Sequence, residues 1–238
     1  MDSAGSKKAD DNSEAAAARR RACVVAAVAG LLPAPYFWLF SAVVGWPGED
    51  APPPSAPVSE FVDYYVDGST DIPLVATIAV GSWVIWLTLI IAVVRAACRR
   101  VDLAGILAVT MAGASTAVYV AAEAVLAWPT IGLTAGEVSQ NLDPGVAQAM
   151  VLSRDGLHAG AGVLLGVSML VVAWLLLRSD LWGHRMLAGL GALAGVSACT
   201  SMIAGPDAIG AGAVLLWGIV VGVFILVGLR HDPGEEGT

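Results

Sequence analysis

The stretch PLVATIAVGSWVIWLTLIIAVV, residues 73–94, decides the fold class of this chain. A helix of about 20 residues, rising roughly 1.5 Å per residue, crosses the hydrocarbon core of a bilayer, and this stretch is long enough and has no charged side chain. Its apolar side chains fall on every face, whereas the strands of a membrane barrel alternate apolar and polar residues. The stretch therefore predicts a transmembrane helix.

The rest of the chain has the same character. Hydrophobic residues make up 57% of it and charged residues 13%, with a mean hydropathy of +0.76. An ordinary soluble domain has about 25% charged residues. Five more stretches are long and apolar enough to span, so we expect an all-α membrane bundle of six transmembrane helices. The predicted spans are residues 22–45, 73–94, 103–128, 157–177, 186–204 and 209–229.

The charges between these spans predict their orientation. Of the 12 lysine and arginine residues, all but Arg154 fall on one side of the membrane if the six spans alternate in direction. Basic loops stay in the cytoplasm during insertion, so this side is predicted to be inside, together with both termini and the tail 230–238. The basic residues on this side are Lys7, Lys8, Arg19, Arg20, Arg21, Arg95, Arg99, Arg100, Arg178, Arg185 and Arg230.

The N-terminal segment 1–21 is polar and has no apolar face to bury, which predicts a disordered cytoplasmic N-terminus. Its three arginines before an apolar run are also typical of a signal peptide. The apolar run continues to Gly45, however, well beyond the roughly 7 to 15 residues of a signal peptide core. We therefore expect an uncleaved first helix.

Two outer segments are long enough to fold. Residues 57–67 follow a proline run and alternate between apolar and acidic positions at helical spacing, which predicts a short amphipathic helix on the outer membrane surface or over the bundle. Its apolar positions are Val58, Phe61, Val62, Tyr65 and Val66. In the second segment, 129–156, a helical turn is expected around Asp143-Pro144-Gly145, with Pro144 at the first helical position.

Ionisable residues inside a membrane are costly to bury and are candidates for function. Glu123 and His158 are the two candidates within the spans, both near the outer side, and Arg154 and Asp155 lie at the same level. Tyr119 is four residues before Glu123 and shares its helix face. Asp207 is in the outer turn between the last two spans. The candidate ligand-binding residues are Glu123, His158, Arg154, Asp155, Tyr119 and Asp207.

These residues allow two interpretations. In one, Glu123 and His158 form the floor of a polar pocket that is open to the outside, with Arg154 at its mouth. Its ligand would be a small polar or cationic molecule, a lipid head group, or a metal held by Glu123, His158 and Asp155. A single histidine is poor evidence for a metal, so none is predicted. In the other interpretation, Glu123 pairs with Arg154 or His158 and joins two helices, or is protonated in apolar surroundings.

Motifs for catalysis are missing from the sequence. It has no Walker motif, zincin motif or serine nucleophile elbow, so no enzymatic activity and no cofactor is predicted. The expected partners are the lipid bilayer and a membrane protein, not nucleic acid. A small secondary transporter is the alternative function and an intramembrane enzyme the third. Glycines four residues apart, as at Gly162 and Gly166 or Gly191 and Gly195, predict close helix packing within the bundle.

Three segments carry a family resemblance. They are FVDYYVDGST at 61–70, RAACRR at 95–100 and LWGHRMLAGLGALAGV at 181–196. The stretch from Val58 to Arg230 resembles a family of bacterial integral membrane proteins, frequent in high-GC Gram-positive bacteria and known only as a domain of unknown function. The resemblance implies a six-helix fold in the bacterial plasma membrane, and it implies no activity, substrate or site residue.

Overall fold

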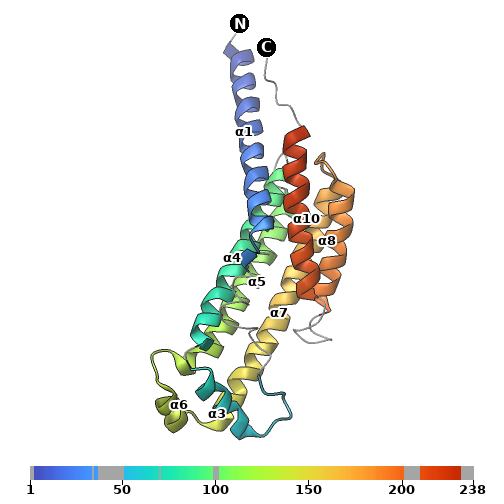
Figure 1. The fold of residues 1–238 in the computed structure, drawn as a ribbon. Coiled ribbons are helices and arrows are strands. Elements are labelled where there is room, and N and C mark those ends of the chain that lie inside the picture. The colour runs from blue at the N-terminus through green and yellow to red at the C-terminus, as the bar shows by residue number, and fades with distance from the viewer. Residues whose placement is uncertain are drawn as a thin grey trace.

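The computed structural model of the chain describes residues 3–33, 35–36, 51–69, 71–98, 102–200 and 210–231. Within these ranges every regular element is helical (Figure 1). The elements are α1 (Ser3–Leu31), α3 (Val58–Asp67), α4 (Asp71–Ala97), α5 (Leu103–Ala127), the 3-10 helix η1 (Trp128–Thr130), α6 (Ala135–Asn141), α7 (Pro144–Leu177), α8 (His184–Cys199) and α10 (Gly210–His231).

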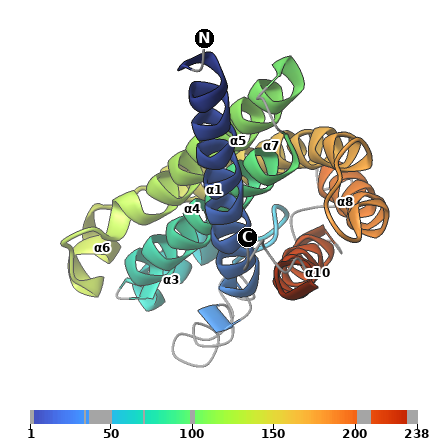
Figure 2. The same ribbon diagram turned by 90° about the horizontal axis from the view of Figure 1, so that it is seen from above.

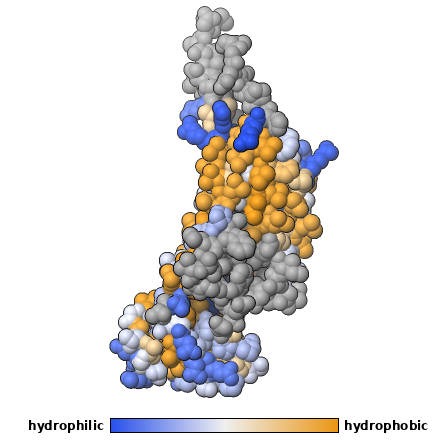
Figure 3. All heavy atoms as spheres, in the orientation of Figure 1, coloured by the Kyte–Doolittle hydropathy of each residue, from blue (hydrophilic) through white to orange (hydrophobic). Residues whose placement is uncertain are grey.

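Four helical stretches of the described chain are long and apolar enough to cross a membrane: Asp71–Ala97, Leu103–Thr130, Pro144–Leu177 and Ala213–Arg230. On the face drawn in Figure 3, apolar side chains cover a broad zone of the bundle, and hydrophilic residues gather at its two ends. A surface of this kind is stable only against lipid. The chain is a membrane-embedded helical protein.

In the described part of the chain, the bundle is a closed ring of α1, α4, α5, α7, α8 and α10, in which each helix packs against the next and α4 also contacts α7 (Figure 2). All six contribute to one hydrophobic core. Its largest side chains include Trp86 of α4 and Trp217 of α10, and the Trp217 indole nitrogen donates to the Leu187 carbonyl of α8 at 3.0 Å. The start of α1 and the end of α10 lie at the same end of the molecule (Figure 1).

A second hydrophobic core lies at the opposite end and supports a small cap made of α3, η1, α6 and the first turns of α7. At about 1.5 Å per residue, the 34 residues of α7 extend roughly 50 Å, well beyond the thickness of a bilayer core. Its first turns therefore reach out of the bundle and carry the cap. The cap buries Phe61 and Tyr65 of α3 beneath that helix.

Capping residues define the outer helices. Asp143 caps α7 by accepting hydrogen bonds from the backbone N–H groups of Gly145 and Val146, and Pro144 occupies the first helical turn, as the sequence predicts. Thr134 and Glu137 form a reciprocal capping box at the start of α6. Bonds to Thr134 lower the pKa of Glu137.

Most predicted boundaries agree with the structure. The amphipathic segment 57–67 is α3, which lies over the bundle. The spans 73–94 and 103–128 are α4 and α5, each end within three residues of the prediction. The stretches 186–204 and 209–229 contain the helices α8, which ends at Cys199, and α10. The predicted ends at 45 and 204 and the start at 209 lie outside the described residues.

Two predicted boundaries need correction. α1 begins at Ser3, so the described part of segment 1–21 is helical and not disordered. Its alanine run and its lysine, glutamate and arginine residues favour a helix even without an apolar face. The span predicted for 157–177 belongs to α7, which begins at Pro144. Hydropathy marks where a helix meets lipid and not where its backbone becomes helical.

Candidate functional site

Helices α5 and α7 run antiparallel and hold the site between them. The Ser115 hydroxyl on α5 donates to the Ala161 carbonyl on α7 at 2.7 Å, and the Ser168 hydroxyl on α7 donates to the Ala108 carbonyl on α5 at 2.8 Å. Both serines are fully buried. Each helix therefore donates one bond to the other, and this fixes the register that brings Glu123 opposite His158.

Glu123 and His158 are in direct contact. His158 Nε2 lies 2.6 Å from Glu123 Oε1, and the imidazole donates this hydrogen bond when the carboxylate is ionised. Arg154 is one helical turn before His158, and its Nη2 lies 3.9 Å from the same oxygen. One carboxylate oxygen thus faces two basic side chains of α7, a strong way to join two buried helices.

A stack of three aromatic rings orients His158. The Tyr119 ring lies 4.5 Å from the His158 ring between centroids and almost parallel to it, with 5° between the planes. Trp83 of α4 stacks on the other face of Tyr119 at 4.4 Å. Three helices therefore meet at this point, and the imidazole plane is fixed by its neighbours.

The cluster is closed to solvent. The side chain of Glu123 is 1% exposed, that of His158 10% and that of Arg154 12%. Helix α3 packs on the first turns of α7, so the cap lies at the same end of the bundle as the cluster. Burial also raises the pKa of the Tyr65 hydroxyl on α3, and the positive charge of Arg154 opposes that rise.

Three buried polar atoms of this region have no hydrogen-bond partner among the described residues: Glu123 Oε2, Arg154 Nε and Tyr65 Oη. They are an acceptor, a donor and a hydroxyl that can do both. Leaving such atoms unsatisfied costs about 1–3 kcal/mol each. The cluster therefore keeps hydrogen-bonding capacity that its own residues do not use.

The remaining predicted site residues have different positions. Asp155 points to Arg154, with its Oδ1 3.4 Å from Arg154 Nη1. Within the part of the chain that the structure describes, no three acidic, histidine or cysteine side chains form a metal-binding group. Asp207 lies outside the described residues.

Two residues of the site were missing from the sequence prediction. Trp83 looks like any apolar residue of a span until the packing of α4 on α5 is known. Tyr65 falls on the apolar face of α3, and nothing in the sequence shows where on the bundle that face rests.

No protein-family model, curated protein or solved structure matches this chain. The functional proposal therefore rests on the geometry of the cluster and of the cap above it.

Proposed function

We propose that the chain is a multi-pass protein of the bacterial plasma membrane that crosses the bilayer six times, with both termini in the cytoplasm. The end of the bundle at which α1 starts and α10 ends is rich in arginine, and the cap is at the other end. The rule that basic segments remain inside places the cap outside the cell.

The positions of α1 and α8 support six spans. Ala26, Ala27 and Ala29 of α1 are buried in the same core as the four long apolar helices, and so are Leu187 and Ala194 of α8. Both helices pack lengthwise in the ring between other spans. A helix in that position shares the membrane with its neighbours.

Within this topology we infer that the cluster of Glu123, His158 and Arg154 binds a small polar ligand at the outer face. The observation that carries this inference is the set of three buried atoms that have no hydrogen-bond partner among the described residues. A helix pair that served packing alone would gain stability by satisfying or removing them. Retained donors and acceptors under a separate cap are typical of a site that a ligand completes.

The charges of the site select the ligand class. Glu123 and Asp155 oppose Arg154, with His158 able to add a second positive charge, so the closed site is close to neutral. A ligand with a large net charge would be left without a counterion in low dielectric surroundings. The ligand is therefore a small neutral or zwitterionic molecule that donates to Glu123 Oε2 and accepts from Arg154 Nε.

A transporter fits the structure less well. The sequence has no charged side chain between Asp102 and Glu123, along α5. It has none between His158 and Arg178, along α7. The two serine hydroxyls along this interface are already bonded across it. A polar path to the cytoplasm has no continuation along these two helices. Among the residues that the structure describes, no nucleophile is bonded to a base as an intramembrane enzyme would require.

Thermal unfolding in detergent with a panel of soluble zwitterions and polyols tests the proposal. We expect at least one compound to raise the Tm of the wild-type protein, because a ligand that binds only the folded state stabilises it. Glu123→Gln keeps the size of the side chain and removes its charge, and this variant should lose the shift.

The matched control is Glu60→Gln, an exposed residue in the first turn of α3, which should keep the full shift. The proposal is wrong if no compound of the panel raises the Tm, or if Glu123→Gln responds as the wild-type protein does.

A further inference from the structure

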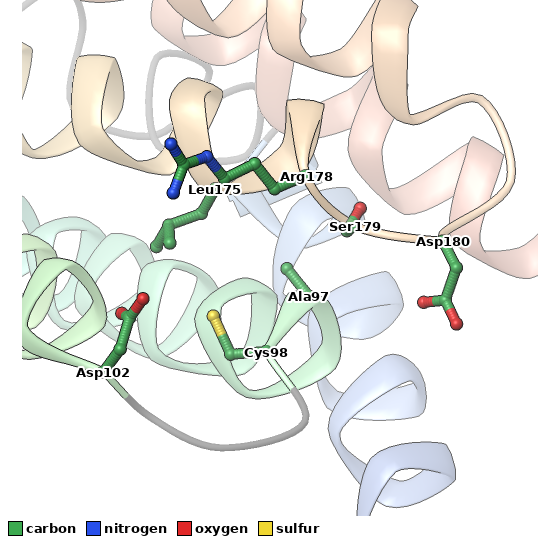
Figure 4. Close-up of a pocket in the computed structure, with 7 residues that line it drawn as sticks. All are labelled: Ala97, Cys98, Asp102, Leu175, Arg178, Ser179 and Asp180. Atoms are coloured by element: carbon green, nitrogen blue, oxygen red, sulfur yellow. The ribbon is translucent and has the colours of Figure 1, made fainter.

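A polar cavity lies at the arginine-rich end of the bundle, far from the cap. It has a volume of about 430 Å³ and opens between the end of α4, the start of α5 and the end of α7 (Figure 4). Its size is in the range of cavities that hold small ligands. The lining includes Cys98, Asp102, Leu175, Arg178, Ser179 and Asp180.

Arg178 supplies the positive charge of this cavity. It follows the last residue of α7, and its guanidinium carbon lies 3.6 Å from the centroid of the Trp174 ring. This stacking holds the guanidinium in place without using its N–H donors. In the described part of the chain, no carboxylate lies within ion-pair distance of Arg178 and no acceptor takes a bond from its side chain.

Asp102 supplies the negative charge from the opposite wall. Its Oδ1 accepts the Gly105 backbone N–H at 2.9 Å and so caps α5, which leaves the other oxygen available. The carboxylate projects toward the cavity in Figure 4. The second acid of the lining, Asp180, is already paired with Arg19 of α1. Among the described lining residues, Arg178 and Asp102 thus bring opposite charges to the cavity from different helix ends without forming an ion pair.

The helix ends next to the cavity carry exposed apolar side chains. These are Leu103 and Leu107 at the start of α5 and Trp174 and Leu177 at the end of α7. The cavity itself lies where α4 and α7 end and α5 begins, which is the level of the lipid head groups. A ligand with a dipolar head and acyl chains would satisfy both surfaces together.

We propose that this cavity binds a phosphoethanolamine group, with the phosphate on Arg178 and the primary ammonium on Asp102, and that a phospholipid of the inner leaflet supplies it. A purely anionic head group would leave Asp102 facing like charge. A trimethylated ammonium has no N–H to donate to that carboxylate. The inner leaflet follows from the proposed topology, whereas the site itself is independent of the outer ligand.

Native mass spectrometry of the full-length protein in detergent tests this site. Phospholipids with identical acyl chains and phosphoethanolamine, phosphocholine or phosphoglycerol head groups are added in turn. We expect the protein to retain the phosphoethanolamine lipid at a lipid concentration about fivefold lower than it needs to retain the phosphocholine lipid. A factor of this order corresponds to the contribution of one charge-assisted hydrogen bond near solvent. Asp102→Asn preserves the helix cap and should remove this preference over phosphocholine.

A second variant separates the two charges. Arg178→Gln should weaken retention of all three lipids, because each of them carries a phosphate. Arg185→Gln is the matched control, an exposed arginine at the same end that does not line the cavity, and it should bind as the wild-type protein does. If the protein also retains soluble phosphoethanolamine, the cavity recognises this group whether it is free or part of a lipid. If the protein retains only the lipid, the phospholipid is the ligand.

Three outcomes would overturn the proposal. The first is equal retention of the phosphoethanolamine and phosphocholine lipids by the wild-type protein. The second is a preference for phosphoethanolamine that survives Asp102→Asn. The third is tightest binding of the phosphoglycerol lipid, which would indicate an anion site governed by arginine alone.

Discussion

Glu123 has two basic neighbours at unequal distances, and both approach the same oxygen. His158 makes the short bond at 2.6 Å, while Arg154 stays at 3.9 Å, beyond hydrogen-bond length. The second oxygen of the carboxylate is unused. The charge of Glu123 is therefore balanced, but its second oxygen has no hydrogen bond. A ligand needs only to donate a hydrogen bond to that oxygen.

Removing this carboxylate should destabilise the fold. Glu123→Ala leaves Arg154 buried without a charged partner within reach except the partly exposed Asp155, and breaking a buried pair in this way costs about 3–5 kcal/mol. We expect a lower Tm in detergent and a smaller loss for Glu123→Gln, which can still bond to His158. The exposed Glu60→Ala is the control. A loss below about 1 kcal/mol for Glu123→Ala would show that Arg154 is not held by this carboxylate.

At the scale of elements, glycine sets how closely the helices approach. A Cβ atom added at Gly166 of α7 would lie 2.6 Å from the Gly195 carbonyl oxygen of α8 and 2.5 Å from Cys199 Sγ. A Cβ added at Gly160, two turns earlier on α7, would meet nothing within 4 Å. The two glycines belong to one helix and differ only in what they face.

This difference predicts opposite results for the same substitution. Gly166→Ala should force α7 and α8 apart and lower stability by about 1–3 kcal/mol. Gly160→Ala should leave stability unchanged or raise it by up to about 1 kcal/mol, since alanine favours a helix over glycine. Thermal unfolding of the two variants side by side decides the matter. Equal effects would mean that the α7–α8 contact is not as close as the structure has it.

The sequence predicts elements well where one physical signal dominates. Long apolar runs place α4, α5 and α10 within three residues, and the amphipathic pattern finds α3. The start of α7 at Pro144 is missed because the outer part of that helix is amphipathic and packs against the cap. The sequence does show the helix-capping residue Asp143 and the following Pro144, but from them it predicts only a single helical turn.

In the candidate site too, the sequence predicts some residues and leaves others to the packing of the helices. Burial cost alone singles out Glu123 and His158. The four-residue spacing from Glu123 adds Tyr119, and the position just before the fourth span adds Arg154. Their contacts depend on the register of α5 against α7, which two buried serines determine through bonds to backbone carbonyls. Most of the predicted spans contain serine or threonine residues, so the sequence does not reveal which of them face a neighbouring helix. The position of α3 is likewise a property of packing.

For the molecule as a whole, the ring of six helices gives two ends with different chemistry. One end has a cap with its own core over a buried acid–base cluster. The other has exposed arginines, a cavity with two separated charges and the ion pair between Arg19 and Asp180, which ties α1 to the segment after α7. Both functional proposals require that these ends face opposite sides of a membrane.

Labelling of single cysteines in intact cells tests that topology most directly. With the three native cysteines replaced, one protein carries Glu60→Cys in the cap and another Arg185→Cys at the opposite end, both at exposed positions. We predict that a membrane-impermeant maleimide labels the Glu60→Cys protein in intact cells and the Arg185→Cys protein only after permeabilisation. Labelling of both proteins in intact cells, or of the Arg185→Cys protein alone, would contradict the account.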